Sequence, residues 1–591
     1  MDRHLPPGDD GIASRLRLLA ILSGLSLLFT TAPAATYHVD PASGSMTNPG
    51  SATQPWSTLE AVFTANKTFA AGDVILLKSG YHGFPQVKGN NSGVVTIRPD
   101  TGQIPKLSRL VVKSGSRWTL EGLDVCPENA GAGLYQDTNI VDLQNSASFV
   151  TLRNCLVRGA FDTTGWTVAD WQDRAGNGIF VQGPDTVLAG NRFENVGYGI
   201  RVRKSAPRTL VSRNTIKDFC MDGIVALGDD CAYEYNTVTG SHVADNNHDD
   251  FFQSWSTFAD GTGSGVGTVY RGTVRGNVFI SRTNANQPLA TEPMGISLFD
   301  GMFEGWVIEN NLVVSNVGNG IVIDGAVNCR IVNNTVAQNL IGGAASSKPF
   351  IKIGQHNDFI DGTSFPPAST GNLIRNNISA STATLVSGGG SIDHNANTTT
   401  YSSWFTDHLA LDFTLKPSSP GMGAGVTDQA PGIDLRELPR TAPYDLGAYE
   451  TQSAPTQDPY QQWLAANGLP TDGSGNGAPE ANPSGDGVSN EMKFALGLPV
   501  SSPGVDGRVT TGKVVVGGKS YLTLTYLRPE PAPAGASYLV RVSGNLVDWS
   551  ATDTVEVSST VESGLRRITV RDTVPASQAG VGRFIRLEVS R

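Results

Sequence analysis

The sequence predicts an all-β protein dominated by a right-handed parallel β-helix, and three observations lead to this prediction. The chain of 591 residues contains 68 glycines, whereas only 16% of its residues are charged and 8% are aromatic. This composition suits many short strands joined by tight turns better than long solvated helices. In addition, a short sequence pattern, Gly followed by alternating apolar residues, recurs along the chain. An Asn also recurs before short strands at a similar interval.

The N-terminal segment, residues 1–35, resembles an export signal. Arg15 and Arg17 precede an apolar run over residues 18–29, and small residues that suit cleavage follow it. An apolar run of about a dozen residues is too short to span a bilayer comfortably. We therefore expect a secreted, cell-surface or periplasmic protein with no membrane span after cleavage, and an uncleaved anchor is the alternative.

Residues 36–450 carry the repeats and are predicted to form the β-helix. The step from Ile179 to Ile200 is 21 residues, and the step from Ile296 to Ile321 is 25 residues. A period in the low twenties made of short alternating strands indicates stacked coils, and the regular scaffold of a leucine-rich repeat is absent. The isoleucines that we expect to point inward and stack are Ile179, Ile200, Ile224, Ile296 and Ile321.

The recurring asparagines are predicted to form a ladder at one turn of the coil. Each side-chain amide can bond to the next coil, which satisfies turn groups that would otherwise be buried without partners. We therefore interpret these residues as structural. They are Asn154, Asn191, Asn214, Asn236, Asn277, Asn311, Asn334 and Asn377.

Both ends of this region resemble modules of secreted bacterial β-helix proteins. The segments 54–59 (QPWSTL) and 72–81 (GDVILLKSGY) resemble the opening module that caps the first coil. The segments 415–420 (LKPSSP) and 445–450 (DLGAYE) resemble the closing module. The resemblance implies the architecture and not a reaction.

After the repeats, the composition changes. Residues 451–506 are rich in Pro, Gly, Ser and Asn and are predicted to be a linker with short helical stretches. Residues 507–591 contain alternating runs that predict a small β-sandwich. This part resembles the C-terminal modules of secreted multidomain bacterial proteins, and its sequence contains no pattern that indicates a catalytic site.

One stretch of the linker, residues 482–491, resembles calcium loops of the dockerin or thrombospondin type 3 kind. The resemblance implies that Asn482, Ser484 and Asp486 bind calcium. The stretch departs from an EF-hand, because its twelfth position is Lys493 where an EF-hand has Glu. A plain linker without calcium is the alternative.

Charge and cysteines limit the function. The formal net charge of −11 argues against binding to nucleic acid, although a local basic groove for an acidic sugar polymer remains compatible with it. The five cysteines form neither a disulfide framework nor a zinc site, because their number is odd and no C-x-x-C pair occurs. We expect the cysteines to be buried thiols, and a Cys220–Cys231 bridge is the alternative. We expect the protein to be a monomer.

Outward-facing positions next to the inward isoleucines should form columns across the coils. Aligning the repeats places basic, acidic and aromatic side chains on one wall. Arginine pairs with carboxylates and aromatic rings stack on sugars, so this wall predicts a site for an acidic sugar. The expected substrate-binding residues are Gln253, Trp255, Asp222, Phe299, Asp300 and Lys204.

The sharpest local signal lies in residues 246–255, where a polar cluster interrupts an apolar strand. The pattern Asn-His-x-Asp-x-x-Gln-x-Trp resembles a motif of secreted β-helix proteins of the alginate lyase and mannuronan C5-epimerase type. The Asp-Pro-His-Glu motif of alginate epimerases is absent, which argues against an epimerase. A polar turn that only caps backbone groups is the alternative.

The resemblance implies β-elimination on a uronate polymer. Such a reaction needs a base for the proton at C5, a group that neutralises the uronate carboxylate, and a proton donor for the leaving oxygen. We assign His248 as the base, oriented by Asp250. The further candidates are Arg201 or Arg203 for the carboxylate, Tyr198 and Lys204 as competing acid or base, and a calcium ion held by Asp222, Asp249 and Asp250 in place of the arginines.

Two other functions stay open. The pair Asp249-Asp250 resembles the carboxylates of polygalacturonase-type hydrolases, although the Asn-Thr-Asp, Gly-His-Gly and Arg-Ile-Lys patterns of that family are missing. A β-helix can also bind a polysaccharide without acting on it, because this fold hosts many functions.

Overall fold

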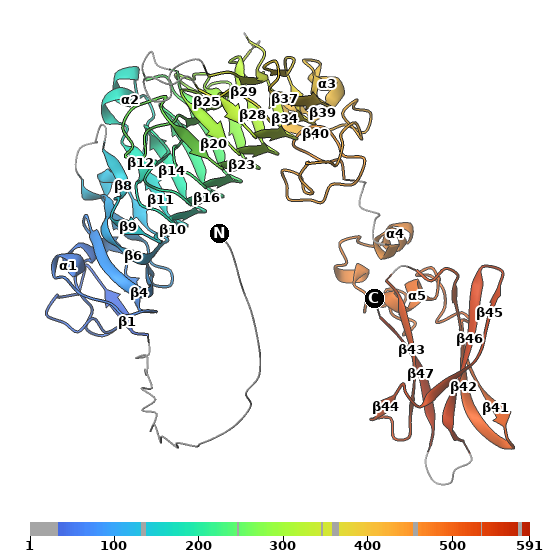
Figure 1. The fold of residues 1–591 in the computed structure, drawn as a ribbon. Coiled ribbons are helices and arrows are strands. Elements are labelled where there is room, and N and C mark those ends of the chain that lie inside the picture. The colour runs from blue at the N-terminus through green and yellow to red at the C-terminus, as the bar shows by residue number, and fades with distance from the viewer. Residues whose placement is uncertain are drawn as a thin grey trace, which may run out of the picture. The chain divides into compact units, whose positions relative to one another are not determined.

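The computed structural model describes residues 34–131, 138–244, 248–343, 347–356, 366–452, 459–533, 535–576 and 582–590. The predicted export signal lies almost entirely outside these residues, and Asn246 and Asn247 of the polar motif also lie outside them. The chain divides into two compact units, Met1–Thr451 and Gln452–Arg591 (Figure 1). Within the described segments, no helix is both long and apolar enough to cross a membrane.

The first unit opens with long strands and a short helix. The strands β1 (Thr36–Val39), β2 (Val74–Leu77), β4 (Gln86–Pro99) and β6 (Leu110–Glu121) pair in parallel in this order. Helix α1 (Leu59–Thr64) begins at Thr58, whose side chain accepts a hydrogen bond from the backbone N–H of Ala61. The helix buries Leu59, Val62 and Phe63 in the core and thereby covers the first coil.

Three faces of parallel strands follow, and one of them positions the candidate site. We call it the first face. Each of its strands pairs in register with the equivalent strand of the next coil. The strands are β8 (Asn139–Leu143), β12 (Asn177–Val181), β15 (Ile200–Val202), β18 (Ile224–Ala226), β21 (Asp250–Ser254), β25 (Met294–Leu298), β29 (Asn319–Asp324), β33 (Phe350–Gly354) and β36 (Thr384–Leu385).

The other two faces complete each coil. The second face consists of β10 (Thr151–Arg153), β13 (Val187–Ala189), β16 (Leu210–Ser212), β19 (Ala232–Glu234), β23 (Thr273–Arg275), β27 (Val307–Glu309), β31 (Arg330–Val332), β34 (Asn372–Arg375) and β37 (Gly390–Asp393). The third face consists of β3 (Gly80–Tyr81), β5 (Pro105–Leu107), β7 (Asp124–Val125), β11 (Leu156–Arg158), β14 (Arg192–Val196), β17 (Thr215–Phe219), β20 (Thr237–Ser241), β24 (Val278–Ile280), β28 (Leu312–Val314), β32 (Thr335–Ala337), β35 (Ile378–Ser379) and β38 (Ala396–Asn397). The parallel β-helix that the repeats predict is therefore confirmed.

Stacked apolar side chains fill the interior of the coils. Ile200 pairs with Ile179 on one side and with Ile224 on the other, and Ile296 pairs with Ile321. All five isoleucines expose at most 1% of their surface. The predicted inward stack is confirmed, so the outward columns between these positions are also in register.

The asparagine ladder runs along the turn between the second and third faces. In each step, the side-chain Nδ2 donates to Oδ1 of the next asparagine at 2.9–3.0 Å. The members are Asn191, Asn214, Asn236, Asn277, Asn311, Asn334, Asn377 and Asn395.

Asn154 is not a member of the ladder, and that prediction is wrong. The backbone N–H of Cys155 donates to Asn191 Oδ1 at 3.0 Å, so Cys155 holds the ladder position in that coil. Asn154 is exposed and has a φ of 54°, a left-handed conformation that asparagine tolerates better than most residues. The cysteines Cys220 and Cys231 are both buried free thiols, so the alternative of a bridge between them is also wrong.

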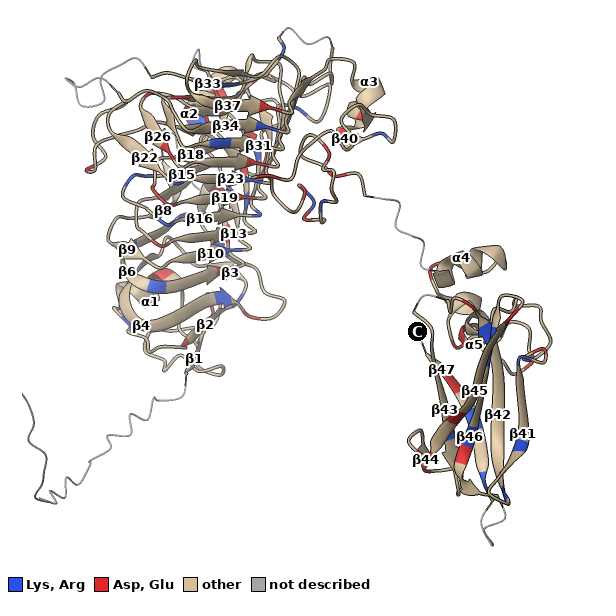
Figure 2. Cartoon of the chain, turned by 45° about the vertical axis from the view of Figure 1, so that its right-hand side comes forward, with Lys and Arg blue, Asp and Glu red and all other residues tan. Residues whose placement is uncertain are grey.

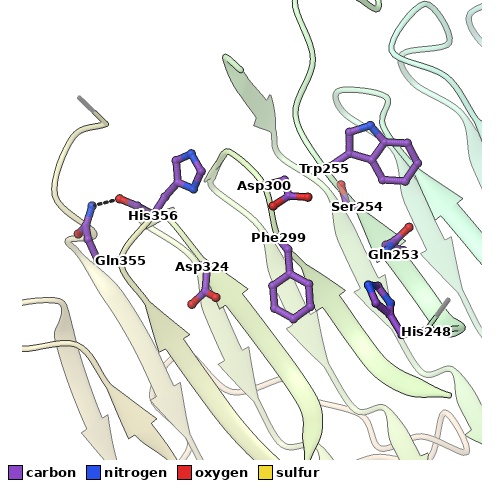
Figure 3. Close-up of a pocket in the computed structure, with 9 residues that line it drawn as sticks. All are labelled: His248, Gln253, Ser254, Trp255, Phe299, Asp300, Asp324, Gln355 and His356. Atoms are coloured by element: carbon purple, nitrogen blue, oxygen red, sulfur yellow. Dashed lines mark hydrogen bonds between the residues drawn. The ribbon is translucent and has the colours of Figure 1, made fainter. Parts of the chain in front are cut away.

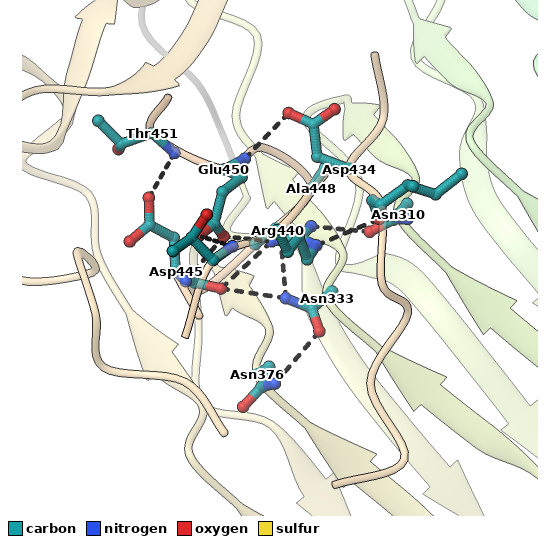
Figure 4. A network of polar contacts seen from close by, with 12 residues as sticks. Asn310, Asn333, Asn376, Asp434, Arg440, Asp445, Ala448, Glu450 and Thr451 are labelled. Carbon is teal, nitrogen blue, oxygen red and sulfur yellow. Dashed lines mark hydrogen bonds and ion pairs between the residues drawn. The ribbon is translucent and has the colours of Figure 1, made fainter. Parts of the chain in front are cut away.

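The predicted closing module folds back against the coils. Short elements, α3 (Tyr401–Trp404), β39 (Phe405–Asp407) and β40 (Asp412–Leu415), precede it. The buried Arg440 binds Glu450 Oε2 at 3.1 Å and Asn310 Oδ1 at 2.8 Å (Figure 4). Asn333 donates to the carbonyl oxygens of Asp445 and Gly447 at 3.1 and 3.2 Å. The module thus contacts several coils through buried polar groups.

The second unit contains helices and two antiparallel sheets. Helices α4 (Pro459–Ala466) and α5 (Asn490–Ala495) pack through Tyr460, Leu464 and Phe494, so part of the expected linker is folded. One sheet has the order β41 (Val509–Val516), β42 (Lys519–Pro529), β46 (Leu565–Pro575) and β45 (Thr554–Glu562). The other has the order β44 (Trp549–Ser550), β43 (Ser537–Ser543) and β47 (Phe584–Ser590). Their shared core confirms a small β-structure at the C-terminus.

Candidate functional site

A cavity of about 320 Å³ lies on the outer side of the first face. Its lining comes from successive coils, which are about 5 Å apart. Because the strands are in register, these side chains form a continuous polar and aromatic wall (Figure 3). The lining residues are His248, Gln253, Ser254, Trp255, Phe299, Asp300, Asp324, Gln355 and His356.

His248 and Asp250 form a hydrogen-bonded pair in this wall. The Asp250 side chain is fully buried, whereas His248 exposes 48% of its side chain. His248 Nδ1 lies 3.0 Å from Asp250 Oδ2, and Gln253 Nε2 donates to the same oxygen at 3.1 Å. Because a carboxylate oxygen accepts hydrogen bonds, Nδ1 carries the proton in this contact, and Nε2 is the nitrogen that can face a ligand.

Asp222 supports the pair from behind. Its Oδ1 accepts a hydrogen bond of 2.9 Å from the backbone N–H of Asp250, and its side chain is buried. Burial and the charge of Asp250 raise the pKa of Asp222 well above its usual range. This buried position does not suit the contact with a substrate that we expected of Asp222.

The pKa values of the pair are shifted as well. The hydrogen bond to Asp250 is the main cause that raises the pKa of His248 above its usual value of 6.5. Burial raises the pKa of Asp250, against the opposing contact with His248. Groups with shifted pKa values that face a cavity are typical of catalytic sites.

Arg201 lies in the expected column but not at the cavity. Arg201 pairs with Val225, and Val225 pairs with Gln253, so two strand spacings of roughly 10 Å separate Arg201 from Gln253. The Arg201 guanidinium carbon lies 4.7 Å from the ring centroid of Phe180 and 4.6 Å from that of Tyr198. Arg201, Arg203 and Tyr198 therefore form a separate cluster, and no arginine or lysine is among the described residues that line the cavity.

Lys204 is held away from the site, which corrects its expected role in substrate binding and proton transfer. Its Nζ lies 2.7 Å from Asp229 Oδ1 and donates to the carbonyl oxygen of Thr268 at 2.9 Å. Only 10% of the side chain is exposed. A lysine in such an ion pair is not available to a sugar.

The residues expected to hold calcium on the first face do not fit this role. Asp249 accepts a hydrogen bond from Ser241 Oγ at 3.2 Å. Asp222 accepts one from the backbone N–H of Asp250, and the Asp250 carboxylate binds His248. Across the described ranges, no group of three His, Cys, Asp or Glu side chains is arranged to hold a metal ion. We therefore assign no calcium to these three carboxylates.

The calcium-like loop of the second unit contains an internal cation. The buried Lys493 Nζ donates to Ser484 Oγ at 2.7 Å and to Asp486 Oδ2 at 2.5 Å. It also donates to the carbonyl oxygens of Val500 and Ser502 at 2.8 and 2.9 Å. A calcium ion bound to Ser484 and Asp486 would have to displace this ammonium group.

Four lining residues had no predicted role, namely Ser254, Asp324, Gln355 and His356. Asp324 forms an ion pair of 3.1 Å with Lys352. Gln355 and His356 follow the first-face strand β33, whose inward Ile351 pairs with Ile321. The step from Ile321 to Ile351 is 30 residues (351 − 321) and the strand lacks the leading Gly, so only the alternation Ile351-Lys352-Ile353 could have indicated this coil.

Comparisons with known proteins agree with this fold. Residues 111–355 match the family model of the right handed β-helix region. No curated protein sequence matches the chain. The β-helix is thus of the right-handed class.

Solved structures that resemble the chain are carbohydrate-related β-helix proteins of low identity. A pectate lyase is 14% identical over 72% of this chain and 98% of its own, with a TM-score of 0.42. A mannuronic acid specific polysaccharide family 6 lyase from human gut microbiota is 13% identical over 61% of this chain and 83% of its own, with a TM-score of 0.33. A tailspike protein mutant of E. coli bacteriophage HK620, in complex with a pentasaccharide, is 9% identical over 94% of this chain and 84% of its own, with a TM-score of 0.32.

Proposed function

We propose that the protein is an exported carbohydrate-active enzyme that cleaves a uronate-containing polysaccharide by β-elimination in the cavity of the first face. The observation that carries this proposal is the His248–Asp250 pair, whose imidazole Nε2 can face a cavity with aromatic walls. Trp255 and Phe299 follow each other on adjacent coils of that wall and suit stacking on successive sugar rings.

In the proposed reaction, His248 is the base. Its Nε2 takes the proton from C5, and the electrons of the C5–H bond form the double bond between C4 and C5 while the C4–O bond breaks. The Asp250 carboxylate holds Nδ1–H and stabilises the imidazolium that results. The imidazolium can then return its proton to the leaving oxygen, which balances the step.

Gln253 is suited to stabilise the charge that develops on the uronate carboxylate. One of its amide N–H groups donates to Asp250, and an amide has a second N–H to offer. Amide donors fixed in this way favour the transition state when they are aimed at developing negative charge. Because no arginine or lysine is among the described residues that line the cavity, this donor takes the role that we expected of Arg201 or Arg203.

The test is the ultraviolet absorbance of an unsaturated uronate product. The purified protein is incubated with alginate, pectate, glucuronan and glycosaminoglycans, and at least one polymer should give this absorbance. His394→Ala is the matched control for His248→Ala, because the exposed His394 also binds an aspartate, with Nδ1 2.9 Å from Asp393 Oδ1. Absence of the absorbance with every polymer would refute the elimination.

Hydrolysis is the second candidate, and the two carboxylates Asp300 and Asp324 in the same cavity favour it. Glycosidases use one carboxyl group as acid and another as base or nucleophile. New reducing ends without ultraviolet absorbance, lost in Asp324→Asn, would support hydrolysis.

A further inference from the structure

Arg203 differs from the other exposed arginines around it. Arg208 binds Asp185 through Nε at 2.6 Å, and Arg271 binds Asp230 at 2.5 Å. Arg203 is exposed as well, but none of the ion pairs among the described residues includes it. An exposed guanidinium without a carboxylate partner can bind an anion from outside.

The Arg203 guanidinium is nevertheless held in place. Its central carbon lies 5.4 Å from the ring centroid of Phe180, and the Arg201 guanidinium lies 4.7 Å from the same ring. Arg201 Nη2 in turn donates to Asn139 Oδ1 at 2.6 Å. Stacking on an aromatic face leaves the N–H edge of a guanidinium open for a bidentate contact with a carboxylate.

The register of the first face gives the distance from Arg203 to the cavity. Arg203 follows Val202, which pairs with Ala226, and Ser254 Oγ donates to the carbonyl oxygen of Ala226 at 2.5 Å. Arg203 therefore lies two coils before Trp255, which corresponds to roughly 10 Å between backbones. This backbone spacing exceeds the length of one sugar ring, so a glycan that lies along the coils can reach both places with different sugars.

A loop connects the two places along the surface. It follows Trp255 and leads to β22 (Thr268–Tyr270). A β-carbon placed on Gly261 would lie 3.8 Å from Arg203 Nη2, and one placed on Gly265 would lie 3.6 Å from the β-carbon of Asp300. The loop thus runs from Arg203 to the rim of the cavity.

We propose that Arg203 is a distal subsite for the carboxylate of a second acidic sugar in a glycan that lies along the β-helix axis. The bound sugar would be about two residues away from the reacting one, because two coil steps separate Arg203 from Trp255 and coil spacing and sugar length are similar. This inference rests on the proposed function for the position of the reacting sugar. It names the substrate class as a glycan with carboxylates on several successive residues.

The experiment measures binding and not turnover. Affinity electrophoresis in gels with polygalacturonate, alginate or neutral dextran compares Arg203→Ala, Arg203→Lys and Arg208→Ala in a His248→Gln background. Arg203→Ala should weaken binding to one acidic polymer about 10- to 100-fold, as for a lost hydrogen-bonded charge pair of roughly 1.5–3 kcal/mol. Arg203→Lys should recover part of the affinity, and Arg208→Ala should behave as the parent protein.

Several outcomes would overturn the subsite. They are no binding of either acidic polymer by the parent, equal binding by Arg203→Ala and the parent, or an equal loss for dextran. Failure of the proposed reaction is a separate result. A wild-type protein that binds an acidic polymer through Arg203 but makes no unsaturated product would refute the elimination and leave the subsite standing.

Discussion

Two regions of each coil, the asparagine ladder and the outward columns of the first face, follow opposite rules. In the ladder, the same residue type returns coil after coil, and each amide satisfies the next at 2.9–3.0 Å. In the columns, residue types change at every coil, from Arg201 through Val225 to Gln253 and Ser297.

This difference indicates that the ladder contributes to stability, whereas the outward columns are available for binding and catalysis. A buried polar group needs a partner, and identical asparagines provide partners to each other, so the ladder has no group left for a ligand. On the first face, the inward positions hold the coil together, and the outward positions are free to vary. The charged residues of the β-helix are accordingly interspersed in both signs along its strands (Figure 2). The cavity lies where the outward positions of β21 and the following coils are polar or aromatic.

The largest expected effect is loss of activity in His248→Ala. A general base contributes about a hundred- to ten-thousand-fold to turnover, so turnover should fall by this factor. The free energy of unfolding should fall by about 1–3 kcal/mol, because the buried Asp250 carboxylate loses one hydrogen-bond partner and keeps Gln253. Initial rates and denaturant unfolding measure the two effects. A variant that keeps its turnover and loses only stability would show that His248 has a structural role and is not the base.

The converse change is Asn236→Ala in the ladder. It removes the bonds of Nδ2 to Asn277 Oδ1 and to the carbonyl oxygen of Val211, and it leaves the backbone N–H of Asn214 without its acceptor. The free energy of unfolding should fall by about 2–3 kcal/mol, whereas turnover of the folded protein should not change. The control is Asn154→Gly, at an exposed position whose positive φ glycine adopts freely. Equal losses in both variants would contradict the ladder as the source of stability.

The pH dependence of kcat/KM tests whether His248, on the first face, is the base. A base acts when it is deprotonated, so a raised pKa of His248 moves the acidic limb of kcat/KM above pH 6.5. Activity should fall about tenfold for each pH unit below this limb. Asp250→Asn removes the main cause of the shift and should move the limb to lower pH. A limb below pH 6.5 in the wild type would show that another group titrates.

The smallest expected effect concerns the second unit. Because the Lys493 ammonium binds Ser484 and Asp486, a calcium chelator should change the free energy of unfolding of this unit by less than about 0.5 kcal/mol. In Lys493→Ala, added calcium should stabilise the unit, since the oxygens lose their internal cation. Thermal unfolding with and without chelator measures both. A wild-type protein that the chelator destabilises would mean that calcium displaces the lysine.

Most of the fold could be predicted from the sequence, because inward positions of a coil obey one requirement. An isoleucine such as Ile200 has to be apolar and in step with its neighbours, and both properties are visible along the chain. Asn154 was misplaced because an exposed left-handed turn and a buried ladder position both favour asparagine. Nothing local in the sequence distinguishes the two.

The site could be predicted in part. The column alignment brought together Gln253, Trp255 and Phe299, because register carries over from the inward residues, and the local polar motif indicated His248. His356 was missed, since the step of 30 residues from Ile321 to Ile351 (351 − 321) departs from the period in the low twenties and the strand lacks the usual glycine. The position of Lys204 could not be predicted either, because the direction of a long side chain depends on Asp229, a residue of the next coil.

The closing module has a consequence for how the β-helix comes apart. A stack of coils can fray from its last coil, because each repeat contacts only its neighbours. Here Arg440 binds Asn310, and Glu437 binds Arg213 at 2.7 Å, far earlier in the stack. Arg375, near the end of the stack, binds Asp428 at 2.7 Å. We therefore expect this segment to couple the final coils, so that the end of the solenoid unfolds as one cooperative block.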